Sequence, residues 1–289
     1  MTLIVSVISA DGIVIGGDSL SSLNRQINMN QSGKVICPHC EKEHTVKANF
    51  QGNISRATFS HTEKVLPFFG KFGIGVFGSG IIGIHSVNFL IRQIEHSFKE
   101  EIKKEKNREK NRKQHNKQQN ILAKGVTQIA ENVGIKLHNY LKKQLDAEEK
   151  SLDDFPDDHI FLGFQIVGYD DLQPKTIEVL LCKDVRFQVF DQLAPYASGS
   201  KEIVAGIWNL HKPEEGLQPI FEIFSLQEAI DYVDFLINST IAYQRFLPIT
   251  PNVGGNIDIA LVRPFKGFQW IRQKPLGELL EEGTYEKIQ

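Results

Sequence analysis

The chain opens on an almost continuous apolar, β-branched run, residues 2–8, and a second such run follows at 13–15. Asp11-Gly12 lies between them, a dipeptide typical of tight hairpins because both residues tolerate positive φ. Runs without polar alternation predict strands that are buried on both faces. We therefore expect an internal hairpin that is covered by helices on one side and by a second sheet on the other.

The remaining apolar patterns follow in blocks of one type. A second hairpin is predicted at 64–69 and 72–77, followed by amphipathic helices at 81–98 and 121–145. Later segments predict strands at 159–168, 176–181 and 186–190, helices at 201–210 and 226–246, and final strands at 257–263 and 268–271. This order of strands, helices, strands, helices and strands favours an α+β fold with antiparallel sheets stacked between helical layers.

Composition excludes several classes of protein. The chain has 289 residues with 41% hydrophobic and 24% charged residues, which is ordinary for a globular protein and argues against wholesale disorder. No apolar run approaches the ~20 residues that span a bilayer, and the first residues lack the basic segment of a secretory signal. Three cysteines do not make a disulfide framework, and a net charge of −2 gives no general attraction to nucleic acid. We expect a cytoplasmic protein with neither membrane nor nucleic-acid partners.

The second residue offers chemistry of its own. Methionine before a small residue is a good substrate for the processing aminopeptidase, so removal of Met1 is expected to leave Thr2 as the amino terminus. A terminal threonine carries its own general base, because its free α-amine has a pKa of about 7.7–8.0 and lies beside the hydroxyl. The predicted hairpin returns residues 18–21 alongside the terminus, so Asp18 should lie near Thr2. The alternative is that Thr2 only begins a strand.

The opening TLIVSVISADGIVIGGDS resembles the start of proteasome β subunits and of the proteasome-like peptidases of bacterial ATP-dependent proteases. Lys64-Val65, followed by the glycine-rich segment 75–80, is similar to the lysine strand and glycine turn of that family, with matching spacing from Lys64 to Gly78. Further matches are the segment 197–201 (ASGSK), the strand FLGFQIVGYD and the glycine pair 254–255. The resemblance covers nearly the whole chain apart from two insertions.

The resemblance implies a single domain over residues 1–289 with the N-terminal nucleophile hydrolase fold, a four-layer αββα sandwich of two antiparallel sheets. By the same resemblance, Thr2 would be the nucleophile and its amine the general base. Lys64 would keep the amine deprotonated through its positive charge, and Asp18 would pair with Lys64. The Gly78 N–H would stabilise the oxyanion and Ser200 would orient the amine. The implied activity is threonine-type cleavage of peptide bonds without a catalytic cofactor.

The implied partners also come from the resemblance. They are peptide or unfolded-protein substrates and further copies of the chain in a homo-oligomeric ring or spiral, and it stays open whether an ATPase or another partner protein feeds the site. The family usually has Asp and Ser in a D-x-x-S-G-G arrangement, where this chain has Thr250-Pro-Asn-Val253-Gly-Gly. Asn252 or Thr250 would have to substitute for them. The alternative function is a catalytically inactive scaffold or partner-binding subunit of the same fold.

Two insertions interrupt the resemblance. The first, about residues 23–60, is a loop containing Cys37-Pro-His-Cys40 and His44, and a C-x-x-C knuckle aims two thiolates at one metal. A structural zinc held by Cys37, Cys40 and His44 needs a fourth ligand, which His61 or a neighbouring subunit could supply; the alternative is a flexible loop with free thiols. The second, about residues 99–120, mixes Glu with Lys and Arg at helical spacing and predicts a solvated helical extension.

Overall fold

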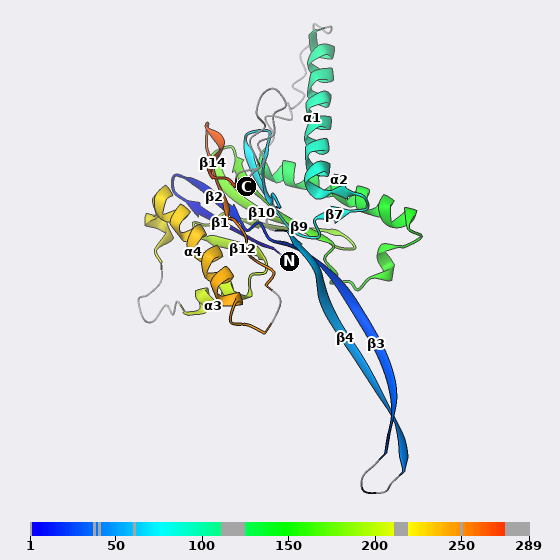
Figure 1. The fold of residues 1–289 in the computed structure, drawn as a ribbon. Coiled ribbons are helices and arrows are strands. Elements are labelled where there is room, and N and C mark those ends of the chain that lie inside the picture. The colour runs from blue at the N-terminus through cyan, green and yellow to red at the C-terminus, as the bar shows by residue number, and fades with distance from the viewer. Residues whose placement is uncertain are drawn as a thin grey trace, which may run out of the picture.

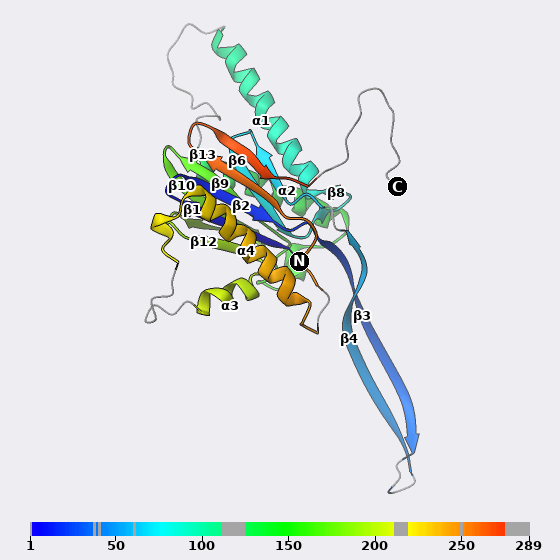
Figure 2. The same cartoon turned by 60° about the vertical axis from the view of Figure 1, so that its left-hand side comes forward.

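The computed structural model describes residues 2–36, 39, 42–59, 62–110, 125–210, 219–248 and 251–274. Two five-stranded antiparallel sheets lie face to face in the middle of the protein, and helices cover the outer side of each sheet (Figures 1 and 2). The protein therefore has the predicted α+β architecture with helical layers outside two stacked sheets.

The first sheet carries both ends of the described chain. Its strand order is β12-β1-β2-β13-β14, and every neighbouring pair is antiparallel. The strands are β1 (Leu3–Ser9), β2 (Gly12–Gly17), β12 (Pro195–Gly199), β13 (Asp258–Arg263) and β14 (Gly267–Arg272). All residues of β1 and β2 are buried, as their unbroken apolar sequence predicts.

The second sheet has the order β11-β10-β9-β6-β5 and is also antiparallel throughout. Its strands are β5 (Val65–Phe68), β6 (Phe72–Gly78), β9 (Leu162–Asp170), β10 (Gln173–Leu181) and β11 (Val185–Phe190). The hairpin β5–β6 confirms the predicted pairing across Gly70-Lys71, with Phe69 and Gly70 both at positive φ in the turn.

Four α-helices and three buried apolar clusters complete the layers of the described chain. Helices α3 (Glu202–Leu210) and α4 (Leu226–Gln244) lie over the first sheet, while α1 (Val87–Lys110) and α2 (Val126–Ala147) lie over the second. One cluster fills each helix–sheet space, and the third lies between the sheets. Short elements are β7 (Ile81–Ile82), β8 (His85–Ser86) and 3₁₀ turns at Leu152–Asp154 and Phe221–Ile223.

The turn between β1 and β2 differs from the prediction. Gly12 already belongs to β2 and pairs with Ser9, so Ala10 and Asp11 form the turn, and neither of them has positive φ. Gly12 instead lies close to α4: a Cβ there would be 2.9 Å from a terminal methyl group of Leu226, so that side chain would have to shift. The hairpin itself is confirmed, and it returns Asp18 to the start of β1, where the Leu3 N–H donates to it.

The first insertion is not a loop over most of its length. Residues Ser21–Ile36 form β3 and Glu43–Phe59 form β4, an antiparallel ribbon that runs from the pair Ser21/Phe59 to the pair Ile36/Glu43. Figures 1 and 2 show this ribbon projecting away from the two sheets. In β4 the apolar residues Val46, Ala48, Phe50 and Ile54 alternate with polar ones, a period-2 pattern that indicates a strand and that the prediction of a loop did not use.

The helix boundaries also correct the predictions in part. Residues 81–86 form the small β7–β8 hairpin, and α1 begins only at Val87. It continues to Lys110, so the charged segment is helical as predicted up to that residue, while 111–124 lie outside the described residues. Exposed ion pairs such as Lys103–Glu100 (2.8 Å) support the predicted solvated surface. Strand β12 was not predicted.

Candidate functional site

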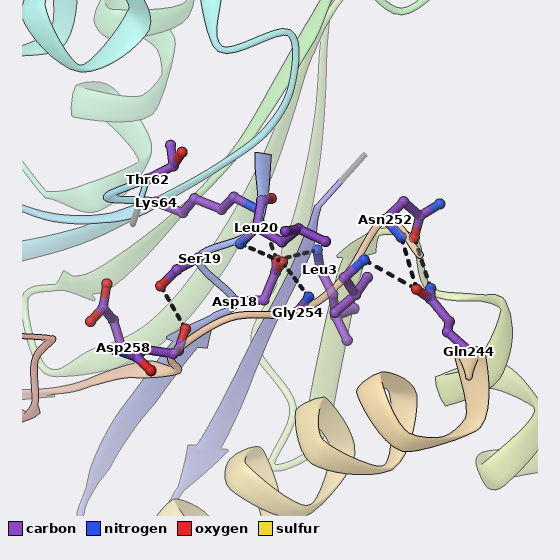
Figure 3. A network of polar contacts seen from close by, with 12 residues as sticks. Leu3, Asp18, Ser19, Leu20, Thr62, Lys64, Gln244, Asn252, Gly254 and Asp258 are labelled. Carbon is purple, nitrogen blue, oxygen red and sulfur yellow. Dashed lines mark hydrogen bonds and ion pairs between the residues drawn. The ribbon is translucent and has the colours of Figure 1, made fainter. Parts of the chain in front are cut away.

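Asp18 is the centre of a buried polar site at the end of β2. It follows Gly17, the last residue of that strand, and its side chain is fully buried. Oδ1 accepts hydrogen bonds from the Leu3 N–H (3.0 Å) and from Lys64 Nζ (3.0 Å). Oδ2 accepts from the N–H groups of Leu20 (3.2 Å) and Gly254 (3.0 Å), as Figure 3 shows. One carboxylate thus joins the start of β1, the root of the ribbon and the segment before β13.

Lys64 lies just before β5 and points into this site. Its side chain is 5% exposed, and its Nζ donates to Asp18 and also to the carbonyl of Leu20. The Val76 N–H donates to the Lys64 carbonyl at 2.8 Å, which fixes the backbone of Lys64 against β6. Lys64 is therefore not a solvated strand lysine, because it is buried in an ion pair.

Burial dominates the electrostatics of the pair. It lowers the pKa of the Lys64 ammonium, since a charged group loses its hydration; the charge of Asp18 acts in the opposite direction and that of Lys274 in the same one. Burial also raises the pKa of the Asp18 carboxyl, while Lys64 and the N–H groups of Gly254 and Leu3 act against that rise. The ion pair and its hydrogen bonds offset part of the cost of burying both charges.

Thr2 and Ser200 lie next to this pair through β12. Leu3 pairs with Gly199 in the sheet, and the Ser200 N–H donates to the Thr2 carbonyl at 2.8 Å. Gly199 has φ +83, and a Cβ there would lie only 1.9 Å from the Thr2 carbonyl oxygen, so only glycine allows this approach. Ser200 Oγ is buried and has no hydrogen-bond partner within the described part of the chain.

Gly78 ends β6 at φ +86 and is exposed. The preceding residue, Phe77, lies against Gly199, since a Cβ on that glycine would be 3.3 Å from Phe77 Cβ. The structure therefore brings Thr2, Asp18, Lys64 and Ser200 together and sets Gly78 at the adjoining strand end. Val76, in β6, is a core residue packed in the cluster between the second sheet and its helices.

Gln244 holds residues 252 and 253, within the segment 250–255 where the sequence departs from the D-x-x-S-G-G arrangement. Gln244 Nε2, at the end of α4, donates to Asn252 Oδ1 (2.7 Å), and Gln244 Oε1 accepts from the N–H groups of Asn252 (2.9 Å) and Val253 (3.1 Å). Val253 is buried in the core under α4, and Thr250 lies outside the described residues. Asn252 is thus bound to Gln244, and it is the backbone of Gly254 that reaches Asp18. The sequence does not indicate that Gln244 supports the site, because Gln244 belongs to no motif and its hydrogen-bond partners lie in a turn.

A second buried ion pair, Lys274–Asp258, lies beside the first and was also missed by sequence analysis. Lys274 stands in a polar segment after the last predicted strand, where a lysine normally faces solvent. Its contacts come from residues distant in sequence, which only the fold brings together.

The proposed zinc ligands cannot be placed as a set. Cys37 and Cys40 lie outside the described residues, as does His61, and only the backbone of His44 is described, in β4 opposite Val35. Within the described ranges, no group of three or more His, Cys, Asp and Glu side chains is arranged to hold a metal ion. Zinc at the ribbon tip stays a prediction. Cys182, in contrast, is a buried free thiol directly after the end of β10.

A scan against protein-family models finds no match, and a search of curated proteins finds none. The family resemblance accordingly depends on the sequence motifs and on the arrangement described above. Among the described helices, none combines the length and the apolar character that a membrane crossing requires.

Proposed function

We propose that this chain is a threonine-type N-terminal nucleophile peptidase with the αββα fold of that superfamily, and that removal of Met1 exposes Thr2. One observation carries the proposal: Asp18 Oδ1 accepts hydrogen bonds from both the Leu3 N–H and Lys64 Nζ, each at 3.0 Å. A buried ammonium is thereby held one residue away from a threonine that can become the amino terminus. A hydrolase that uses its own terminal amine as base needs such a charge nearby.

The proposed chemistry uses a small set of groups. Thr2 Oγ attacks the carbonyl carbon of a peptide bond while the α-amine takes the hydroxyl proton, and the amine then returns this proton to the leaving amine. Water hydrolyses the resulting ester by the same proton transfers in reverse. The positive charge of Lys64 keeps the α-amine neutral near pH 7 by lowering its pKa. The Gly78 N–H stabilises the oxyanion, and Ser200 Oγ, which lacks a partner in the described chain, binds the amine.

The substrates and partners belong to the same proposal. Peptides or unfolded proteins are the substrates, in the cytoplasm, and copies of the chain assemble into a ring or spiral. An ATPase or other partner protein would be needed only for folded substrates, since unfolded chains reach a peptide-cleaving site without one.

A catalytically inactive scaffold is the second candidate function, and two residues favour it. Val253 is 1% exposed in the apolar core, and Asn252 is bound to Gln244. Neither therefore supplies a polar group to the amine or to Lys64. In this case the fold and the buried ion pair would serve assembly or partner binding.

The test combines mass spectrometry with two variants. The intact mass of the protein from its native host is expected to show complete loss of Met1. Fluorogenic peptide libraries should be cleaved by the parent and by Thr2→Ser, which keeps a hydroxyl, and should not be cleaved by Thr2→Ala. Equal turnover by Thr2→Ala and the parent, or a retained Met1, would leave the scaffold as the better function.

A further inference from the structure

Lys274 is a fully buried lysine just beyond β14. Its side chain is 0% exposed and that of its ion-pair partner Asp258 is 1% exposed. The Lys274 N–H also donates to Asp258 Oδ1 at 2.8 Å, so the backbone and the ammonium of one residue both bind one carboxylate. This pair anchors the end of β14 to the start of β13.

The ammonium of Lys274 also contacts both segments that carry the site. It donates to Ser19 Oγ (3.2 Å) and to the Thr62 carbonyl (2.8 Å). Ser19 follows Asp18, and Thr62 is two residues before Lys64. With Asp258 as the third acceptor, all three ammonium protons of Lys274 have a partner.

Ser19 and Thr62 lie on either side of the ribbon, Ser19 before β3 and Thr62 after β4, and they also bind each other. The Thr62 N–H donates to the Ser19 carbonyl at 3.0 Å, and Ser19 Oγ donates to the Asn256 carbonyl at 2.6 Å. Figure 3 shows Ser19 and Thr62 close to Asp18 and Lys64. The ammonium of Lys274 therefore adds a further link between these two segments, beside the direct hydrogen bond that joins them.

The position of Lys64 in turn depends on the segments that contain Ser19 and Thr62. Its Nζ is held by Asp18 and by the carbonyl of Leu20, which are the residues on either side of Ser19. A shift of Ser19 would move both acceptors, and a shift of Thr62 would move the backbone that leads into Lys64. The charged groups that act on Lys64 are Asp18 and Lys274.

A contribution to stability does not by itself explain why the protein contains a second buried ion pair, Lys274–Asp258. Replacing a buried ion pair by apolar residues of similar size is often neutral or stabilising, because desolvation costs as much as the pair gains. We propose that Lys274, held by Asp258, is a positioning residue of the Thr2 site that fixes the Ser19 and Thr62 segments and so keeps Lys64 on Asp18 and Leu20. The inference rests on the proposed peptidase activity for its catalytic readout only.

The test uses the double variant Lys274→Met/Asp258→Asn, which removes both charges and leaves neither one buried alone. The matched control is Arg272→Met/Asp234→Asn, a partly exposed ion pair between the last residue of β14 and α4; Arg272 also donates to the Ile257 carbonyl, but the pair does not bind Ser19 or Thr62. We expect the double variant to lose at least tenfold in kcat with less than a twofold change in KM, and the control to keep both. A kcat that stays within twofold of the parent would overturn the proposal.

A second readout needs no enzymatic activity. In protein labelled with ¹³C at lysine Cε, with the Lys64 signal assigned by Lys64→Arg, a pH titration of Ser19→Ala, which keeps the charge of Lys274, should give Lys64 a pKa that differs from that in the parent, while the control should leave it unchanged. An unchanged Lys64 titration in folded Ser19→Ala overturns the positioning role. If the parent cleaves nothing and matches Thr2→Ala, the peptidase proposal fails, while the titration still decides the role of Lys274.

Ser19→Ala covers the case in which the double variant does not fold. It removes the one side-chain contact between Lys274 and the segment 18–20 and leaves both charges paired. We expect a smaller loss in kcat, together with a shift in the Lys64 pKa that the retained charge of Lys274 cannot by itself produce. A folded Ser19→Ala protein with parental kcat and parental Lys64 titration counts against the proposal.

Discussion

Lys64 Nζ and Asp18 Oδ1 are 3.0 Å apart although the two residues are separated by 46 positions in the sequence. Their side chains are 5% and 0% exposed, so each charge depends on the other for its burial. The pair also holds the start of β1 through the Leu3 N–H. Loss of either partner should therefore affect both the stability of the fold and the proposed chemistry at Thr2.

Lys64→Met should be strongly destabilising, because it leaves the Asp18 carboxylate buried without a counter-charge. Breaking a buried pair in this way typically costs about 3–5 kcal/mol. Urea denaturation of the variant measures the free energy of unfolding, and peptide cleavage should be lost as well. Lys150→Met is the control: its pair with Glu148 (2.7 Å) is exposed on both sides, so we expect a change within about 0.5 kcal/mol. A loss below about 1 kcal/mol for Lys64→Met would show that the pair matters little to folding.

Gly199→Ala should displace Thr2. Gly199 has φ +83, and the new Cβ would lie 1.9 Å from the Thr2 carbonyl oxygen, a contact that only backbone movement can relieve. We expect destabilisation of at least about 2 kcal/mol by thermal or urea unfolding, together with loss of cleavage. Gly206→Ala is the matched control, since a Cβ there meets nothing within 4 Å and alanine is the better helix former in α3. Equal stability of the two variants would refute the close approach at Thr2.

Gln244→Ala should loosen the turn that carries Gly254 to Asp18. The change removes three hydrogen bonds to Asn252 and Val253 and leaves buried N–H groups without partners, which costs about 1–3 kcal/mol. We expect reduced activity as well as reduced stability, measured by peptide turnover and urea unfolding. Gln192→Ala removes an exposed amide that binds only the neighbouring Asp191 and should change neither. Full activity in folded Gln244→Ala would separate this turn from the site.

Tyr169 should set an alkaline limit to stability. Burial raises its pKa to about 12, with the charge of Asp11 acting in the same direction. The unfolded chain therefore releases the phenolic proton near pH 10, before the folded one does, so stability falls as the pH rises from 10 to 12. Because Tyr169 is half-buried, we expect a loss of about 1 kcal/mol rather than the full value of the shift.

Tyr169→Phe tests this directly by urea unfolding at pH 8, 10 and 11.5. The variant should show a smaller alkaline decline than the parent, because Tyr196 and Tyr232, whose pKa values burial also raises, still contribute to it. It should keep most of its stability at pH 8, since the Tyr169 hydroxyl makes only a 3.5 Å contact with the Val262 carbonyl. Tyr243→Phe, at an exposed position, should decline as the parent does. Identical pH profiles for Tyr169→Phe and the parent would contradict the expected role of this side chain.

The sequence predicts the parts of the fold that depend on local patterns. The hairpin of β1 and β2 follows from its β-branched run, and its return places Asp18 against Leu3 without any further information. Amphipathic spacing predicts α2 and α4 to within a few residues at most boundaries. Lys64 and Ser200 are identified by motif spacing, and the structure brings both to the same end of the first sheet.

Other features leave no local signal. Strand β12 combines proline, tyrosine and small residues and is a strand because β1 offers it an edge. Strand β3 is largely polar, and only β4 shows an alternation of apolar and polar residues, from Val46 to Ile54. Lys274 becomes buried through partners in distant segments, and Gln244 through the nearby turn at Asn252 and Val253; neither set of contacts follows from a local sequence pattern.

The ribbon also bears on the order in which this protein folds. If Asp18 and Lys64 met by random motion of the chain, a loop of 46 positions would have to close in one step. Strands β3 and β4 instead pair from Ile36/Glu43 to Ser21/Phe59, with one register shift between Leu23 and Asn24. A hairpin that forms from its turn replaces one long closure by many short steps, each with a small entropy cost, and hairpins form within about 1–10 μs. We therefore expect formation of the ribbon to bring the two charges together before the two sheets pack against each other.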